Sequence, residues 1–237
     1  LIGYVVISLL LSLWVLPGLI AALTPVPWSA VITMTKDALV TAFMTGNLFV
    51  VLPQLTEQAK AMLEEYAALK PSDAGVTEVI VPTSFNFPHI GKLLSLSFVL
   101  FAGWYADAAL SLTDYPRLAA VGVLVLFGNI NVALPFLLDL FRVPADTFQL
   151  FLATSVINAR FGTLMAAVHT LAMALLGTCA VIGALKVDGR RLLRFAIVTA
   201  LLTTATIGGT RLLFALTLKT EYDKDEIVAG MQAVRER

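Results

Sequence analysis

The chain opens with LIGYVVISLLLSLWVLPGLIAAL, residues Leu1–Leu23, a stretch that contains no charged side chain. A helix that spans the hydrocarbon core of a bilayer needs about 20 predominantly apolar residues, and this stretch is long enough. Two later stretches, Thr147–Leu185 and Leu192–Leu218, are also long and mostly apolar. The three stretches predict an all-α protein that crosses a membrane several times.

The composition agrees with a membrane protein and excludes several other classes. Hydrophobic residues make up 59% of the chain and charged residues 14%, against about 45–50% and about 25% in soluble domains. Lys and Arg, 16 together, balance 16 Asp and Glu, so no basic surplus predicts a nucleic-acid partner. A single cysteine, Cys179, excludes an internal disulfide. The sequence holds no motif of a nucleophile–base pair or a metal set, so we expect no enzyme activity, no catalytic residue and no metal.

Three further apolar segments are interrupted. Asp37–Leu55 and Leu118–Phe141 each contain a Gly-Asn pair and a Leu-Pro pair, and Glu78–Ala106 carries two prolines, a histidine and a lysine in its first half. Irregular backbone at membrane depth survives only against protein or a watery cavity. We therefore predict two re-entrant hairpins, at about 37–55 and 118–141, and a broken transmembrane helix between them.

The two interrupted segments match each other. GNLFVVLP at 46–53 aligns with GNINVALP at 128–135, and five of the eight positions are identical. If both segments are hairpins, they enter the membrane from opposite faces and form an inverted repeat. Secondary transporters are commonly built from such repeats, with the substrate near the bilayer midplane. Chance similarity between two apolar strings is the alternative.

Positive charges in short loops predict the orientation, because Lys and Arg accumulate on the cytoplasmic side. With two hairpins in place, one side collects most of them: Lys36, Lys60, Lys70, Lys186, Arg190, Arg191 and Arg194. We therefore expect a multi-pass protein of the inner (cytoplasmic) membrane, with the polar tail 219–237 on the extracytoplasmic side.

The segment KDALVTAFMT at 36–45, with Leu52-Pro53 after it, resembles the first re-entrant hairpin of the glutamate/aspartate and C4-dicarboxylate:cation symporter family. The serine-rich tip of that family is absent here. The resemblance covers about 1–185 and implies the transport half of the fold, with scaffold helices upstream that form a homotrimer. Segment 186–218 is an additional transmembrane helix. We expect the tail to lead to a fused extracellular domain, such as a solute-binding module, that lies outside this chain.

The resemblance implies a substrate arginine, which is Arg160 in this sequence. A guanidinium suits a carboxylate because its fork binds both oxygens. The residue alone leaves two alternatives open, a structural ion pair and an anchor on backbone carbonyls. The family's aspartates near this arginine correspond to Ile157 and Val168, so a dicarboxylate or other simple acid is favoured over a substrate with an ammonium group. The expected substrate-binding residues are Arg160, Thr163, Asn129, Asn131, Thr45 and Asn47, with Gly46 and Gly128 in the hairpin gates.

The ion-binding motif of the family is altered. Pro88, His89 and Lys92 stand where the family has oxygen ligands for sodium, and hard cations need oxygen ligands. We hypothesise that the ammonium of Lys92 takes the electrostatic place of sodium, and that His89 allows proton coupling. A snorkelling Lys92 and a structural His89 are the alternatives. The ion-coupling candidates are Asn86, His89, Lys92 and Asn158.

Two functions follow from these expectations. The first is secondary-active symport of a small carboxylate, a dicarboxylate or an acidic amino acid, by alternating access, with sodium or a proton as the coupling cation and no other cofactor. The second is a transporter-derived membrane receptor that binds solute without net transport. The partners expected are the carboxylate solute, the lipid bilayer and further copies of the chain.

Overall fold

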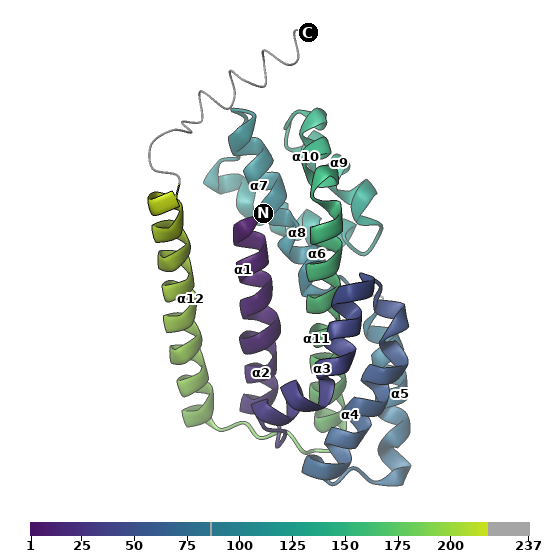
Figure 1. Ribbon diagram of the computed structural model, residues 1–237. Helices are drawn as coiled ribbons and strands as arrows, with labels where there is room; N and C mark the ends of the chain where they lie inside the picture. Colours follow the sequence, from purple (N-terminus) through teal and green to yellow (C-terminus); the bar gives the residue numbers. More distant parts are fainter. Residues whose placement is uncertain (86, 218–237) are drawn as a thin grey trace. The chain divides into compact units, whose positions relative to one another are not determined.

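The computed structural model describes residues 1–85 and 87–217, and these residues form helices joined by turns, without a strand (Figure 1). Asn86 and the tail 219–237 fall outside the described residues. The chain divides into two compact units, 1–195 and 196–237. The second unit contains most of α12, which covers Gly189–Thr217.

The first apolar stretch is one helical run with a wide turn in its middle. It consists of α1 (Ile2–Leu10), a π-helical turn at Leu11–Val15 and α2 (Leu16–Leu23). Pro17 lacks an N–H and clashes with the carbonyl four residues earlier, and a π turn relieves such a clash. That carbonyl, of Leu13, accepts a hydrogen bond from the indole of Trp28 at 3.0 Å instead.

The first interrupted segment is the turn of a long helical hairpin, formed by α3 (Trp28–Thr45) and α4 (Leu52–Ala67). α3 ends at Gly46, whose φ of 63° is the left-handed conformation that glycine adopts most readily. The Asn47 side chain then caps a 3₁₀ turn by accepting the N–H of Phe49 at 3.0 Å. The hairpin is longer than the predicted 37–55, because the polar helix after the Leu-Pro pair forms its second arm.

The next segment is broken at Pro88, whereas Pro82 lies inside the helix that precedes the break. α5 (Ala74–Ser84) stops, and the helix resumes as α6 (Ile90–Leu94) and α7 (Leu96–Tyr105). Pro88 removes a donor and disfavours helix in the residue before it. Gly91 then lets α6 lie directly against the backbone of Gly162, since a Cβ at Gly91 would be 2.7 Å from the Gly162 carbonyl oxygen.

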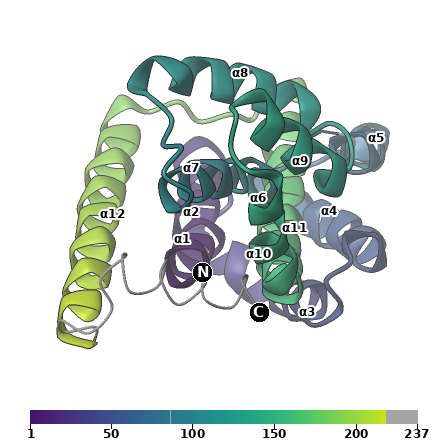
Figure 2. The ribbon, with the colours of Figure 1, turned by 90° about the horizontal axis from the view of Figure 1, so that it is seen from above.

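The second hairpin consists of α8 (Tyr115–Val125) and α9 (Ile130–Leu140). A short α10 (Phe148–Ala153) and the long α11 (Ser155–Val181) follow it. Figures 1 and 2 show this hairpin beside α7 and α10, which its contacts confirm.

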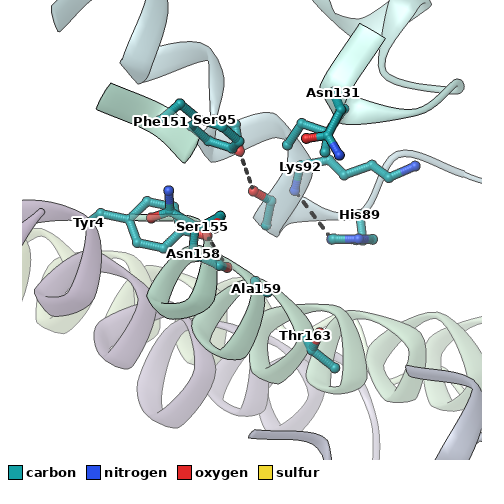
Figure 3. Close-up of a pocket in the computed structure, with 13 residues that line it drawn as sticks. Tyr4, His89, Lys92, Ser95, Asn131, Phe151, Ser155, Asn158, Ala159 and Thr163 are labelled. Atoms are coloured by element: carbon teal, nitrogen blue, oxygen red, sulfur yellow. Dashed lines mark hydrogen bonds between the residues drawn. The ribbon is translucent and has the colours of Figure 1, made fainter. Parts of the chain in front are cut away.

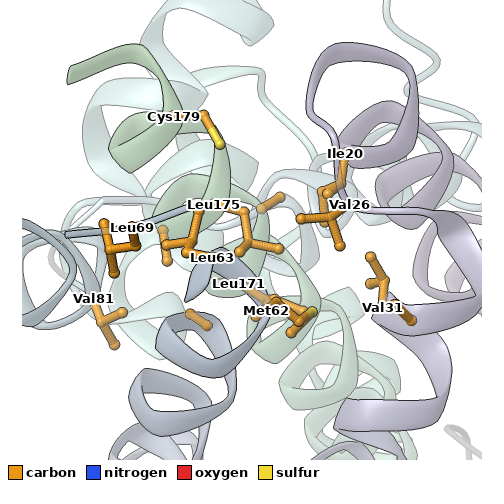
Figure 4. Packing of buried hydrophobic residues seen from close by; sticks show 14 residues of the cluster. Ile20, Val26, Val31, Met62, Leu63, Leu69, Val81, Leu171, Leu175 and Cys179 are labelled. Atoms are coloured by element: carbon orange, nitrogen blue, oxygen red, sulfur yellow. The ribbon is translucent and has the colours of Figure 1, made fainter. Parts of the chain in front are cut away.

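α11 organises the packing of the first unit. It contacts α2, α3, α4, α5 and α6, and its buried face joins two hydrophobic clusters with these helices, one of which Figure 4 shows. A third cluster holds the second hairpin against α7 and α10 and contains no residue of α11. The two hairpins are therefore packed into different hydrophobic clusters.

Three helical runs among the described residues are long and apolar enough to cross a membrane: Ile2–Leu23, Ser155–Val181 and Gly189–Leu212. Each overlaps one of the three long apolar stretches of the sequence, although the second run begins only at Ser155, because Phe148–Ala153 forms the separate short helix α10. The prediction of an all-α membrane protein is confirmed to this extent.

Candidate functional site

A cavity of about 280 Å³ lies where the break after α5, the start of α9 and the first half of α11 meet. Figure 3 shows Lys92, His89 and Asn131 on one side of it and Ser155, Asn158 and Thr163 on the other. The cavity thus brings residues from distant parts of the chain together beside a helix long enough to span a membrane.

The α11 side of the cavity is a polar stripe. Ser155, Asn158 and Thr163 line the cavity together with Ala159. The steps of three and four residues from Ser155 to Asn158 and from Ala159 to Thr163 place the set on one helix face. The amide nitrogen of Asn158 donates to Thr154 Oγ1 at 2.8 Å. This bond fixes the orientation of the Asn158 amide.

Lys92 connects α6 to the second hairpin. Its Nζ donates to the carbonyl oxygens of Leu126 at 3.3 Å and Gly128 at 3.2 Å, both in the turn between α8 and α9. In the part of the chain that the structure describes, no carboxylate lies within 4.0 Å of this ammonium. Lys92 is therefore a cation solvated by backbone carbonyls of a hairpin tip.

The start of α9 supplies one cavity residue and one cap. Asn129 caps the helix, and its side-chain oxygen accepts the N–H of Asn131 at 2.8 Å. Asn131 itself lines the cavity, whereas Asn129 does not. The two predicted asparagines therefore have different structural roles.

Arg160 lies on α11 but does not line the cavity. Its guanidinium donates to the carbonyl oxygens of Met44 at 2.5 Å and Phe43 at 3.4 Å. These carbonyls belong to the last turn of α3, where helical carbonyls lack partners along the chain. In this arrangement Arg160 anchors the end of α3, which is one of the alternatives that the sequence left open.

The tip of the first hairpin lies next to the cavity wall. A Cβ at Gly46 would be 3.9 Å from the Cβ of Ala159, which is a lining residue. The hydroxyl of Thr45 donates to the Thr41 carbonyl at 2.8 Å, and Asn47 caps the following turn. These two side chains shape the tip and do not line the cavity.

The sequence did not single out Tyr4, Ser95 or Phe151, which also line the cavity. Tyr4 stands in an apolar run with nothing to distinguish it, and its hydroxyl donates to the Asn158 carbonyl at 3.2 Å. Ser155 was missed as well, although it lies one helical turn before Asn158, a spacing that would have indicated it.

Of the predicted site residues, the structure brings five to the cavity, namely Thr163, Asn131, His89, Lys92 and Asn158. Arg160, Asn129, Thr45, Asn47, Gly46 and Gly128 lie outside its lining. One ammonium among neutral polar side chains can bind a small polar anion. Comparisons with protein-family models, with curated proteins and with solved structures found no match to this chain.

Proposed function

We propose that this chain is the transport half of a secondary-active transporter, which moves a small carboxylate across the cytoplasmic membrane by alternating access. The observation that carries the proposal is a cavity with one ammonium and several hydroxyl and amide groups in its lining, between a broken helix, a hairpin tip and a helix long enough to span the bilayer. A carboxylate fits the ammonium and the amide and hydroxyl groups of this cavity.

The two hairpins are the proposed gates, and we propose that both re-enter the membrane. The first, α3 and α4, packs on α11; the second, α8 and α9, belongs to a separate cluster with α7 and α10. The second hairpin can move together with α7 and α10, because its apolar contacts stay within that cluster. Opening of the first would separate apolar side chains that it shares with α11 in two clusters. Opening of one hairpin at a time would expose the cavity to one side of the membrane at a time.

The proposal includes a coupling mode without sodium. The carbonyls of Leu126 and Gly128 surround the Lys92 ammonium, and such oxygens are the ligands that a free hard cation needs. Lys92 would then supply a permanent cation, and His89 would couple uptake to a proton. Uptake that strictly requires sodium would contradict this part of the proposal.

The surroundings of the chain follow from the same proposal. α12 is long and apolar enough to cross the bilayer, and it would carry the tail to the extracytoplasmic side. The family resemblance adds a homotrimer, formed through scaffold helices upstream, and a fused solute-binding domain beyond the tail.

The test is uptake into proteoliposomes of radiolabelled succinate, aspartate and lactate, with the sodium and pH gradients varied independently. Accumulation of a carboxylate above its equilibrium level, driven by either gradient, is the expected result. Binding of a carboxylate without accumulation under any gradient would refute transport. That outcome would favour a receptor that has kept the cavity of a transporter.

A further inference from the structure

The charges around the cavity restrict the ligand that it can hold. Lys92 is the one described lining residue with a fixed charge, because Asp, Glu and Arg are absent from that lining. His89 accepts the backbone N–H of Lys92 at Nδ1, 3.3 Å away, and a ring nitrogen that accepts a hydrogen bond carries no proton. The described lining therefore has one positive charge and no negative charge.

Lys92 has neutral partners in the protein. Its two hydrogen bonds to described residues, 3.2 and 3.3 Å long, go to carbonyl oxygens. An ammonium has three donors, so these bonds leave one donor for a ligand. A carboxylate makes shorter bonds to an ammonium than a neutral carbonyl does, and they are roughly twice as strong. An anionic ligand would thus supply the counter-ion that the described part of the protein does not.

A second charge on the ligand would have no partner. Arg160, the other cation of the predicted site, is outside the lining and donates to the end of α3. A second carboxylate in the cavity would lose its water without gaining a cation, which is unfavourable. An ammonium group on the ligand would equally lack a carboxylate. Other polar side chains of the lining, among them Asn131, Ser155 and Thr163, are neutral and suit a hydroxyl or oxo group.

We propose that the ligand is a small monocarboxylate with a hydroxyl or oxo group next to the carboxylate, and that Lys92 Nζ is its counter-ion. The proposal rests on the carboxylate-transport function proposed above and narrows its substrate class. Because the same ammonium holds the carbonyls of Leu126 and Gly128, the bound carboxylate joins α6 to the tip of the second hairpin. Lys92 thereby determines both the charge of the ligand and the closure of that hairpin over it.

The test is calorimetric titration of the purified protein in lipid nanodiscs with four probes: lactate, pyruvate, lactamide and succinate. Lactamide replaces the carboxylate by a neutral amide of similar shape, and succinate adds a second carboxylate. Lys92→Met removes the charge and keeps the length of the side chain, whereas Lys92→Arg keeps the charge. Lys60→Met is the control, since Lys60 pairs with Glu78 on α4 and α5 and is not a lining residue.

Lactate or pyruvate should bind at least tenfold more tightly than lactamide and succinate. Lys92→Met should weaken that binding at least tenfold, about 1.4 kcal/mol, while Lys92→Arg keeps the preference for one charge and Lys60→Met keeps the affinity. Failure of both monocarboxylates to bind the wild-type protein would overturn the proposal. So would tighter binding of succinate that is lost in Arg160→Met and survives in Lys92→Met.

Transport and ligand assignment can fail separately in these measurements. Lactate binding that depends on Lys92, without accumulation in proteoliposomes, refutes the transporter and leaves the monocarboxylate site. Accumulation of succinate in Lys92→Met proteoliposomes keeps the transporter and refutes the assignment of Lys92. A thermal unfolding curve of each variant shows whether a lost affinity reflects a lost fold, and Lys92→Arg decides the question if Lys92→Met does not fold.

Discussion

Substitution of Gly91 by alanine tests the geometry on which the cavity depends. Gly91 is the second residue of α6, and the Cβ of an alanine there would lie 2.7 Å from the Gly162 carbonyl oxygen and 3.0 Å from its Cα. Both are backbone atoms of α11, so no side-chain rotation relieves the clash. α6 and α11 must move apart.

The size of the movement follows from these distances. Ordinary contact begins at 3.4 Å, so the carbonyl must recede by about 0.7 Å from its present 2.7 Å. Overpacking of this kind costs about 1–3 kcal/mol, which is roughly a 5- to 150-fold change in the folding equilibrium. The movement also shifts Lys92 relative to the α11 residues on the other side of the cavity. Carboxylate binding should therefore weaken together with stability.

The assay is unfolding by SDS in mixed micelles, which gives the free energy of unfolding of each variant, with lactate titration beside it. Gly75→Ala is the matched control, because Gly75 is likewise the second residue of its helix, α5, and a Cβ there meets nothing within 4 Å. Alanine is the better helix former, so the control should be unchanged or more stable by less than about 1 kcal/mol. If Gly91→Ala unfolds at the same SDS fraction as the wild type or at a higher one, α6 does not lie against α11 as closely as described.

Three further predictions concern other parts of the fold. The buried hydroxyls of Thr77 and Thr178 share a hydrogen bond of 3.1 Å between α5 and α11. Each single change to valine should lower the free energy of unfolding by about 1–3 kcal/mol, and the double change by much less. Additive losses in a double-mutant cycle would contradict this. Arg160→Met removes the donor to the carbonyls that end α3. It should lower the free energy of unfolding by about 1.5–3 kcal/mol, while the affinity for lactate changes less than tenfold. Lost lactate binding at unchanged stability would assign Arg160 to the ligand. Hydrogen bonds from the Ser111 hydroxyl and N–H lower the pKa of Asp114. Protection of the Ser111 amide in hydrogen exchange should therefore be present above about pH 4 and be lost as pH falls through the lowered pKa, a step that Asp114→Asn should not show.

Local chemistry explains what the sequence determined by itself. The membrane helices could be read from length and hydropathy, because the thickness of the hydrocarbon core imposes both on any spanning helix. The turn of the first hairpin could be read from Gly46, and the break before α6 from Pro88, because both residues restrict or permit backbone conformations whatever surrounds them. The length of the first hairpin could not be read in the same way. The hairpin extends to Ala67, because its second arm packs on α11 despite its polar sequence.

Only the tertiary structure decided which polar side chains meet. Lys92 and Arg160 are both isolated cations in the sequence, yet Lys92 lines the cavity and Arg160 anchors α3. Tyr4 reaches Asn158 across 154 positions of the chain, a pairing that no local pattern contains. Such contacts depend on how helices pack, and helix packing is set by the combined shape of many apolar side chains, whereas propensity and hydropathy act on each segment alone.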